Sequence, residues 1–143
     1  MTVYAPLSPV SAGIYAALNV AGLLTVAPGG VHDDLPQSTA YPCVLFEVAE
    51  EDDSAFGSRP GSGPGSMSRI TLRVHVYSQS GGMKECQTVM AKVKELLRTA
   101  PAASGFSVWD IWFESETPFG DEVLLGVKVK ELVGQWWIAV EEA

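Results

Sequence analysis

Residues Ile70–Thr99 read ITLRVHVYSQSGGMKECQTVMAKVKELLRT and contain two different hydrophobic periods. In the first part, apolar and polar side chains alternate with the period of two that a half-buried strand requires. After the turn at Ser80–Gly82, apolar residues recur at spacings of three and four, which is typical of a helix with one buried face. The apolar strand positions are Ile70, Leu72, Val74 and Val76, and the helical ones are Met83, Cys86, Met90, Val93 and Leu97. These patterns predict a helix packed across a sheet.

The rest of the chain supplies further helices and strands of the same kinds. A helix is expected from about Ser8 to Leu24, because Ser8 can cap it and Pro9 suits its first turn. Ser80 can cap the second helix in the same way. The expected strands are Cys43–Val48, Ile70–Ser78, Ser107–Phe113, Glu122–Val133 and Gly134–Val140, with a turn at Thr117–Gly120. Trp109, Ile111 and Phe113 are expected on one side of their strand. The order predicts a single α+β domain over residues 1–143, with a mainly antiparallel sheet and two helices packed on one face.

One long segment is unsuited to regular structure. Ser54–Ser68 reads SAFGSRPGSGPGSMS, and glycine, serine and proline occupy most of its positions. A connection this long is unusual inside a compact domain, which indicates a functional or disordered loop. We expect a flexible loop over about 54–68 that orders when the protein assembles, with plain disorder as the alternative.

Composition narrows the classes of function. Hydrophobic residues make up 47% of the 143 residues and charged residues only 18%, which suggests that part of the surface meets another chain. A well-packed monomer with a serine- and glycine-rich surface is the alternative. The net charge of −8 argues against general phosphate binding, and no lysine or arginine precedes Arg59. The acidic cluster Glu47–Asp53 is either a solvated strand end or a surface that lets DNA pass without binding it.

The cysteines and the apolar N-terminal segment indicate a protein made in the cytoplasm. Cys43 lies in an apolar strand and Cys86 on the apolar stripe of a helix, so buried free thiols are expected, although a disulfide between them stays open. Val10–Val26 lacks the positively charged start of a signal peptide. No stretch is apolar enough for a membrane span, so a soluble protein without a membrane partner is expected.

The sequence offers no convincing set of catalytic or metal-binding residues. His75 lies beside Arg73 and Tyr77 on the polar side of its strand, where a sheet-surface histidine is the simpler interpretation than a general base. The adjacent His32, Asp33 and Asp34 do not converge as metal ligands, and the glycine-rich loop lacks the phosphate-binding pattern. We therefore expect no enzyme activity and no cofactor.

Three blocks of sequence follow one another in a characteristic order: SPVSAGIYAALNV at 8–20, the segment Val31–Gln37 followed by Tyr41–Val44, and TLRVHVYSQSGGMKECQTVMAKVKELL at 71–97. These blocks resemble the phage tail completion family, the tail terminator or tail-to-head joining proteins of long-tailed phages and gene transfer agents. Together they extend over about the first two-thirds of the chain. The long Gly/Ser/Pro insertion and the adjacent Trp136 and Trp137 depart from the family pattern.

The resemblance implies a structural virion protein at the head-proximal end of the tail. Such a subunit forms a ring, commonly a hexamer, that ends the tail tube, meets the head connector or neck protein, and lets DNA pass through its lumen. An outward tryptophan of the Trp136–Trp137 pair would be a good interface anchor. Candidate subunit or partner contacts are Arg59, Arg73, His75, Tyr77, Trp136 and Trp137. A small ligand-binding or regulatory α+β domain of ferredoxin-like type is the alternative.

Overall fold

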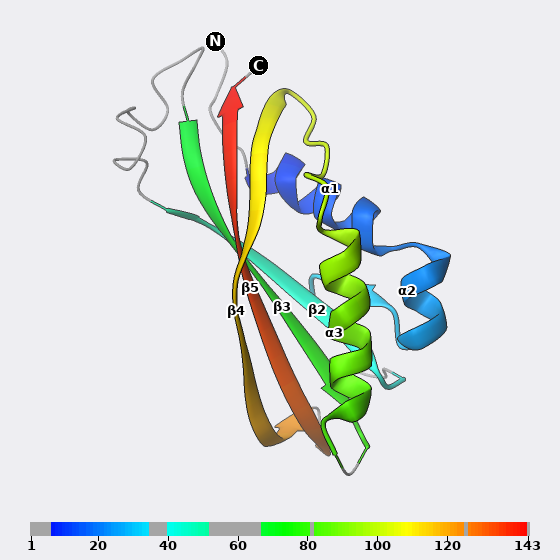
Figure 1. Cartoon of the computed structure of the whole chain (residues 1–143). Helices are drawn as coiled ribbons and strands as arrows, with labels where there is room; N and C mark the ends of the chain where they lie inside the picture. The colour runs from blue at the N-terminus through cyan, green and yellow to red at the C-terminus, as the bar shows by residue number, and fades with distance from the viewer. Residues whose placement is uncertain (1–6, 35–39, 52–66, 81, 125, 143) are drawn as a thin grey trace.

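The computed structural model describes residues 7–34, 40–51, 67–80, 82–124 and 126–142, and arranges them in two layers (Figure 1). The helices are α1 (Leu7–Leu18), α2 (Ala21–Val26) and α3 (Lys84–Leu96). The strands are β1 (Val31–His32), β2 (Cys43–Glu51), β3 (Met67–Ser78), β4 (Phe106–Leu124) and β5 (Val127–Glu142). All three helices lie on one face of the sheet. The expected α+β class is confirmed.

The five strands form one sheet in the order β1-β2-β3-β5-β4. Every neighbouring pair is antiparallel except β1 and β2, which are parallel. β3 and β5 therefore lie inside the sheet, whereas β1 and β4 are its edges. The edges differ greatly in length, because β1 has two residues and β4 has nineteen.

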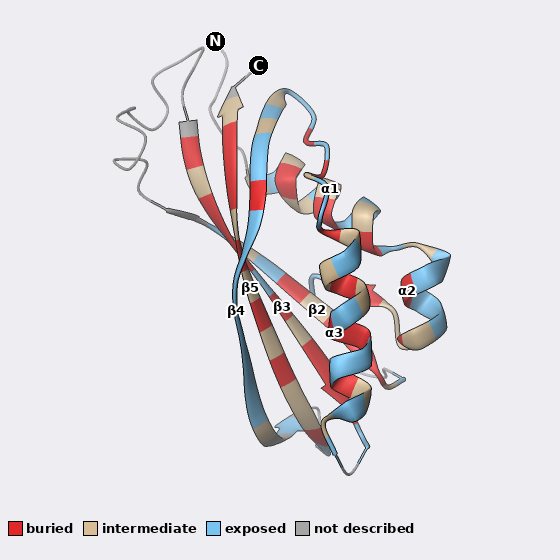
Figure 2. Ribbon diagram, viewed as in Figure 1, coloured by how far each residue is buried: buried red, intermediate tan, exposed pale blue. Residues whose placement is uncertain are grey.

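The core lies between the sheet and the helices, as the alternation of 70–76 predicts. The four apolar positions of β3 are fully buried, and α3 places four apolar side chains against them (Figure 2). Those side chains are Cys86, Val89, Met90 and Val93. α1 adds Val10, Ile14 and Leu18 from successive turns of one helical face. The core is the largest contiguous apolar cluster in the described part of the chain.

The N-terminal helix and the cap of the second helix differ from the expectation. The helix over 8–24 is divided into α1 and α2, with Val20 in an extended conformation between them. Ser80 does not cap α3, because the N-cap residue is Met83 and no side chain caps it. Instead, the Ser78 hydroxyl accepts a hydrogen bond from the Ser80 backbone N–H and donates one to the Glu85 carboxylate. Ser78, two residues before Ser80, therefore organises the start of α3.

The expected turn at Thr117–Gly120 is wrong. β4 runs through these residues, and the chain reverses near Gly126, whose φ of 79° is a left-handed conformation that favours glycine. Proline is tolerated at Pro118 because β4 is an edge strand and a bulge follows directly, the two settings in which a sheet accepts proline. Likewise, the two strands expected at Glu122–Val133 and Gly134–Val140 are not separate, because β5 runs without a break over 127–142.

β-bulges also change the side to which Trp109 points. β4 shifts register against β5 at three places, between Val108 and Asp110, Phe113 and Ser115, and Pro118 and Gly120. The first shift separates Trp109 from Ile111, with Ile111 buried on the helix side and Trp109 64% exposed. A bulge places two residues opposite one, so strict alternation fails there.

Cys43 and Cys86 are free and buried. The Cys86 thiol on α3 donates to the Val76 carbonyl at 3.6 Å, whereas Cys43 belongs to a smaller cluster with Tyr77 and Val129. Burial raises the pKa of Cys43 to about 12, with a further contribution from Cys86. Burial also raises the pKa of Cys86 to about 11, with contributions from Glu85 and Glu131.

The raised thiol pKa values predict a loss of stability in alkali. Between pH 9 and 11 the unfolded chain releases thiol protons that the folded chain keeps, so the free energy of unfolding falls as pH rises and is unaffected by these groups below pH 8. Urea unfolding at pH 8, 9.5 and 10.5 measures this slope. We expect a shallower slope in the double variant Cys43→Ala/Cys86→Ala, and equal slopes would contradict the assignment.

The expected loop lies mostly outside the described residues, apart from Met67 and Ser68, which belong to β3. Among the described helices, none is both long and apolar enough to cross a membrane.

Candidate interaction surface

The face of the sheet that the helices leave uncovered carries a continuous set of polar side chains. We call it the open sheet face. It is formed by Glu47 of β2, Arg69, Arg73, His75 and Tyr77 of β3, Asp110, Trp112 and Glu114 of β4, and Glu131, Gln135, Trp137 and Glu141 of β5. These residues share one face because side chains alternate along each strand and the register brings them side by side.

His75 lies at the centre of this face and contacts two carboxylates. Its Nε2 is 3.1 Å from Glu47 Oε1, and its Nδ1 is 3.1 Å from Glu131 Oε2. The Tyr77 ring stacks with the His75 ring, and the two ring centroids are 6.1 Å apart with their planes inclined by 7°. Each ring nitrogen of His75 therefore faces a carboxylate oxygen, which is a hydrogen-bond acceptor. His75 thus joins three strands, β2, β3 and β5.

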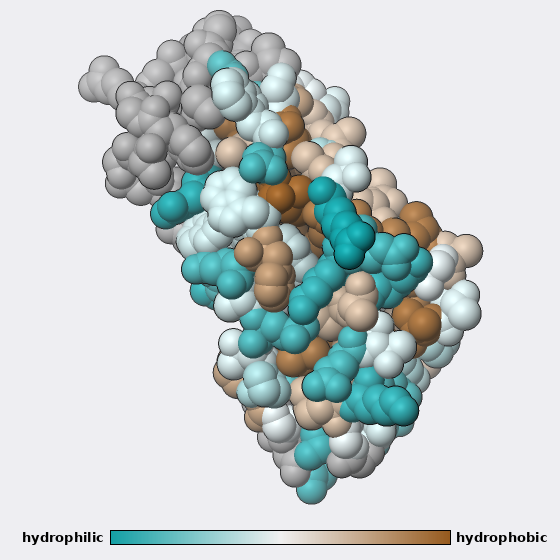
Figure 3. All heavy atoms as spheres, viewed as in Figure 1, coloured by the Kyte–Doolittle hydropathy of each residue, from teal (hydrophilic) through white to brown (hydrophobic). Residues whose placement is uncertain are grey.

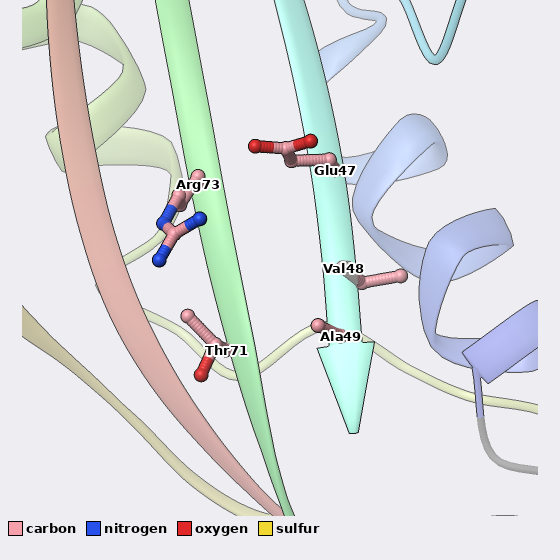
Figure 4. A pocket seen from close by; sticks show the side chains of 5 residues that line it. All are labelled: Glu47, Val48, Ala49, Thr71 and Arg73. Atoms are coloured by element: carbon pink, nitrogen blue, oxygen red, sulfur yellow. The ribbon is translucent and has the colours of Figure 1, made fainter. Parts of the chain in front are cut away.

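A second chain of hydrogen bonds crosses the sheet next to His75. Arg73 Nε donates to Gln135 Oε1 at 3.3 Å, and Gln135 Nε2 donates to Glu114 Oε2 at 2.6 Å. Figure 4 shows the Glu47 carboxylate extending from β2 toward β3, whereas Val48 points away from it. An open hollow of about 340 Å³ lies over this region, between Glu47, His75 and Phe119. The polar side chains of Arg73, Gln135 and Glu114 are therefore suited to polar contacts with a partner.

Aromatic side chains occupy the other end of the open sheet face. The Arg69 guanidinium lies 4.3 Å from the centroid of the Trp137 ring, a cation–π distance. Trp109 Nε1 donates to Glu141 Oε2 at 2.7 Å, which fixes the indole while leaving its ring exposed. Aromatic rings held in place by polar contacts are typical anchors of protein interfaces.

The structure brings together four of the six residues proposed from the sequence. Arg73, His75, Tyr77 and Trp137 lie on the open sheet face, where Tyr77 is only 6% exposed, whereas Trp136 points into the core and is 2% exposed. Arg59 lies outside the described residues. Glu131, Gln135 and Glu114 were missed, since sequence alone does not reveal which residues of distant strands become neighbours. The richness of 106–124 in aromatic and acidic residues was the available signal.

The polar side chains of this surface are largely paired within the chain. Its ionisable groups pair with one another, and the described residues include no group of three or more His, Cys, Asp or Glu side chains suited to a metal ion. Paired groups of this kind fix the position of side chains and present charge to a partner.

The His75 contacts predict a measurable contribution to stability. Glu131 is 12% exposed and Glu47 is 57% exposed, so the Glu131 contact is the better protected from solvent. We expect His75→Ala to lower the free energy of unfolding by about 1–2 kcal/mol, because it leaves Glu131 without this partner. Urea unfolding tests this. Glu131→Gln should cost more than Glu47→Gln, and the reverse order would contradict the geometry.

Comparison with known proteins places the chain in a family. Residues 12–123 match the model of the family described as "Tail completion protein gp17". No curated protein matches the chain. Among solved structures, a chain of the "Virion of native gene transfer agent (GTA) particle" has a similar fold, with a TM-score of 0.73 and 17% sequence identity. The match covers 96% of this chain and 98% of that one. This chain belongs to the tail completion protein gp17 family and is a structural protein of the virion tail.

Proposed function

We propose that the protein forms a hexameric ring on the head-proximal end of the tail tube. The ring stops tube polymerisation and presents a surface for the head connector. The observation that carries this proposal is the family match over residues 12–123, which includes α2, α3 and all of the sheet except β5 and the end of β4. The similar fold of a gene transfer agent virion chain supports it.

The charge of the chain is compatible with a ring through which DNA passes. A net charge of −8 disfavours tight contact with the phosphate backbone, so DNA can move through a lumen without being retained. The partners in this proposal are further copies of the chain, the tail tube protein and the connector or neck protein. DNA is a passenger and not a specific ligand.

The test removes the protein from particle production. We expect tails made without it to vary widely in length, to exceed the normal length and to remain unattached to heads, as seen by negative-stain microscopy. Complementation with the wild-type chain should restore uniform tails. Tails of normal length attached to heads in the absence of the protein would refute the proposed function.

A further inference from the structure

β4 is an exposed edge strand with an unusual surface. Its sequence contains five acidic residues and no lysine or arginine. Among the described residues of the chain, seven large apolar side chains are exposed, and five of them lie on β4. They are Trp109, Trp112, Phe113, Phe119 and Val123. Figure 2 shows this strand exposed along most of its length. Exposed apolar edges of this kind are covered by a partner or protected from pairing.

The three bulges of β4 favour contact through side chains. The residues between the paired positions are Trp109, Glu114 and Phe119, spaced five residues apart. Bulges interrupt a ladder and increase its twist, which disfavours the addition of another strand along the edge. At the same time, Glu141 holds the Trp109 indole and Gln135 holds the Glu114 carboxylate. The edge therefore presents anchors that are already ordered.

The side of the molecule that carries α2 differs in character from β4. The segment Leu7–Val26 contains no charged residue, and Leu24 of α2 is exposed. The neighbouring α3 places Lys84 beside the hollow described next and Lys92 beside α2, whereas Lys94 lies toward β4 of the same copy, where it pairs with Glu116 at 3.1 Å. An open hollow of about 420 Å³ lies between α2 and the start of α3, lined by Val26, Ser80, Lys84, Glu85 and Thr88. We call α2, this hollow and the adjoining side of α3 the helical surface.

The two surfaces are placed for contact between successive copies. β4 forms one edge of the sheet, whereas α2 packs on α3 at the far side of the domain (Figure 1). Figure 3 shows apolar atoms reaching the surface among polar ones on the face that carries α3 and β4. Two unlike patches on opposite sides of a subunit are what a head-to-tail contact requires. Acidic residues on one and lysines on the other add charge complementarity.

We propose that the β4 edge of one copy docks on the helical surface of the next copy. Trp109, Trp112 and Phe119 are the apolar anchors, and the acidic residues of β4 other than Glu116 face Lys84 and Lys92 of α3. This inference rests on the proposed ring and names its subunit contact. A contact repeated in one direction closes into a ring when its rotation permits, and each copy then uses both surfaces.

Two variants, each defective in one surface, test the contact. The edge variant is Trp109→Ala/Phe119→Ala, and the helical variant is Leu24→Glu/Lys84→Glu; all four side chains are exposed. Ala16→Glu, on an exposed position of α1, is the matched control for added charge. Thermal unfolding checks that each variant folds. Native mass spectrometry and sedimentation then measure assembly of each variant, of the control and of an equimolar mixture of the two variants.

We expect the wild type and Ala16→Glu to form rings and each double variant to be monomeric, with a dissociation constant raised by at least about 30-fold. The mixture should give a one-to-one dimer that cannot close, since only one intact pair of surfaces remains. Rings from either double variant, or a mixture that stays monomeric, would overturn the docking contact and leave the ring proposal standing. Dimers of the helical variant alone would indicate β4 pairing with β4 and would also overturn it. A monomeric wild type would overturn both proposals.

Discussion

Trp136→Ala is expected to lower the free energy of unfolding by about 3–5 kcal/mol, the cost of deleting a large aromatic side chain from a packed core. Trp136 is 2% exposed and belongs to the largest fully buried side chains of the described structure. Its ring meets Phe113 edge to face, with centroids 5.2 Å apart. Gly134 provides the space, because a Cβ there would lie 2.6 Å from Trp136 Cζ3. The chain cannot easily refill this volume.

Trp112→Ala is the matched control. Trp112 lies on the same pair of strands and faces the other side of the sheet, where it is 39% exposed. Its removal should cost less, about 1–2 kcal/mol, because Trp112 lies outside the core cluster and its loss leaves no enclosed cavity. Urea unfolding at matched low protein concentration compares the two variants. Equal losses for Trp136→Ala and Trp112→Ala would contradict the assignment of Trp136 to the core.

Gly13→Ala is expected to destabilise the protein by about 3 kcal/mol, although alanine is normally the better helix former by about 1 kcal/mol. A Cβ at Gly13 would lie 1.9 Å from the carbonyl oxygen of Ala102, which is backbone and cannot rotate away. Either α1 or the segment before β4 must therefore move. This glycine allows the first helix to approach the connection that leads into β4.

Gly22→Ala supplies the comparison in a helix of the same layer. A Cβ there would lie 2.9 Å from Lys92 Cε, the far end of a flexible side chain that can turn aside. We expect no loss of stability, or a gain of up to about 1 kcal/mol from helix propensity. Chemical denaturation of both variants gives the difference. A Gly13→Ala variant as stable as Gly22→Ala would show that α1 does not pack as described.

The segment 70–99 could be predicted because its periodicity depends on local sequence alone. One face of β3 and one face of α3 are buried, and both patterns are uninterrupted. The division between α1 and α2 could not be predicted, since Asn19 and Val20 carry no strong helix-breaking signal. Val20 is extended and packs against the core, and its intrinsic preference for a helix is weak.

The predicted turn at Thr117–Gly120 failed for a different reason. Proline and glycine usually mark turns, but an edge strand tolerates both when a bulge is present. Whether a strand is an edge depends on the order of the whole sheet, which local sequence does not contain. The same bulges reversed the side of Trp109 relative to Ile111.

The candidate surface was predicted in part. Alternation placed Arg73, His75 and Tyr77 on one face of a single strand, and they do share the open sheet face. Their partners Glu47 and Glu131 lie 28 and 56 residues from His75, so only the strand register brings them within hydrogen-bond distance. Sequence periodicity gives the face of a strand, whereas contacts across strands require the topology.

The position of the protein on the particle is the most direct test of the proposed function. A small tag at the C-terminal end, decorated with gold and viewed on purified particles by electron microscopy, reports that position. We expect label at the junction between head and tail and nowhere else on the tail. Label spread along the tube, confined to the distal tip, or absent from particles that contain the tagged chain would contradict the proposed role at the head-proximal end.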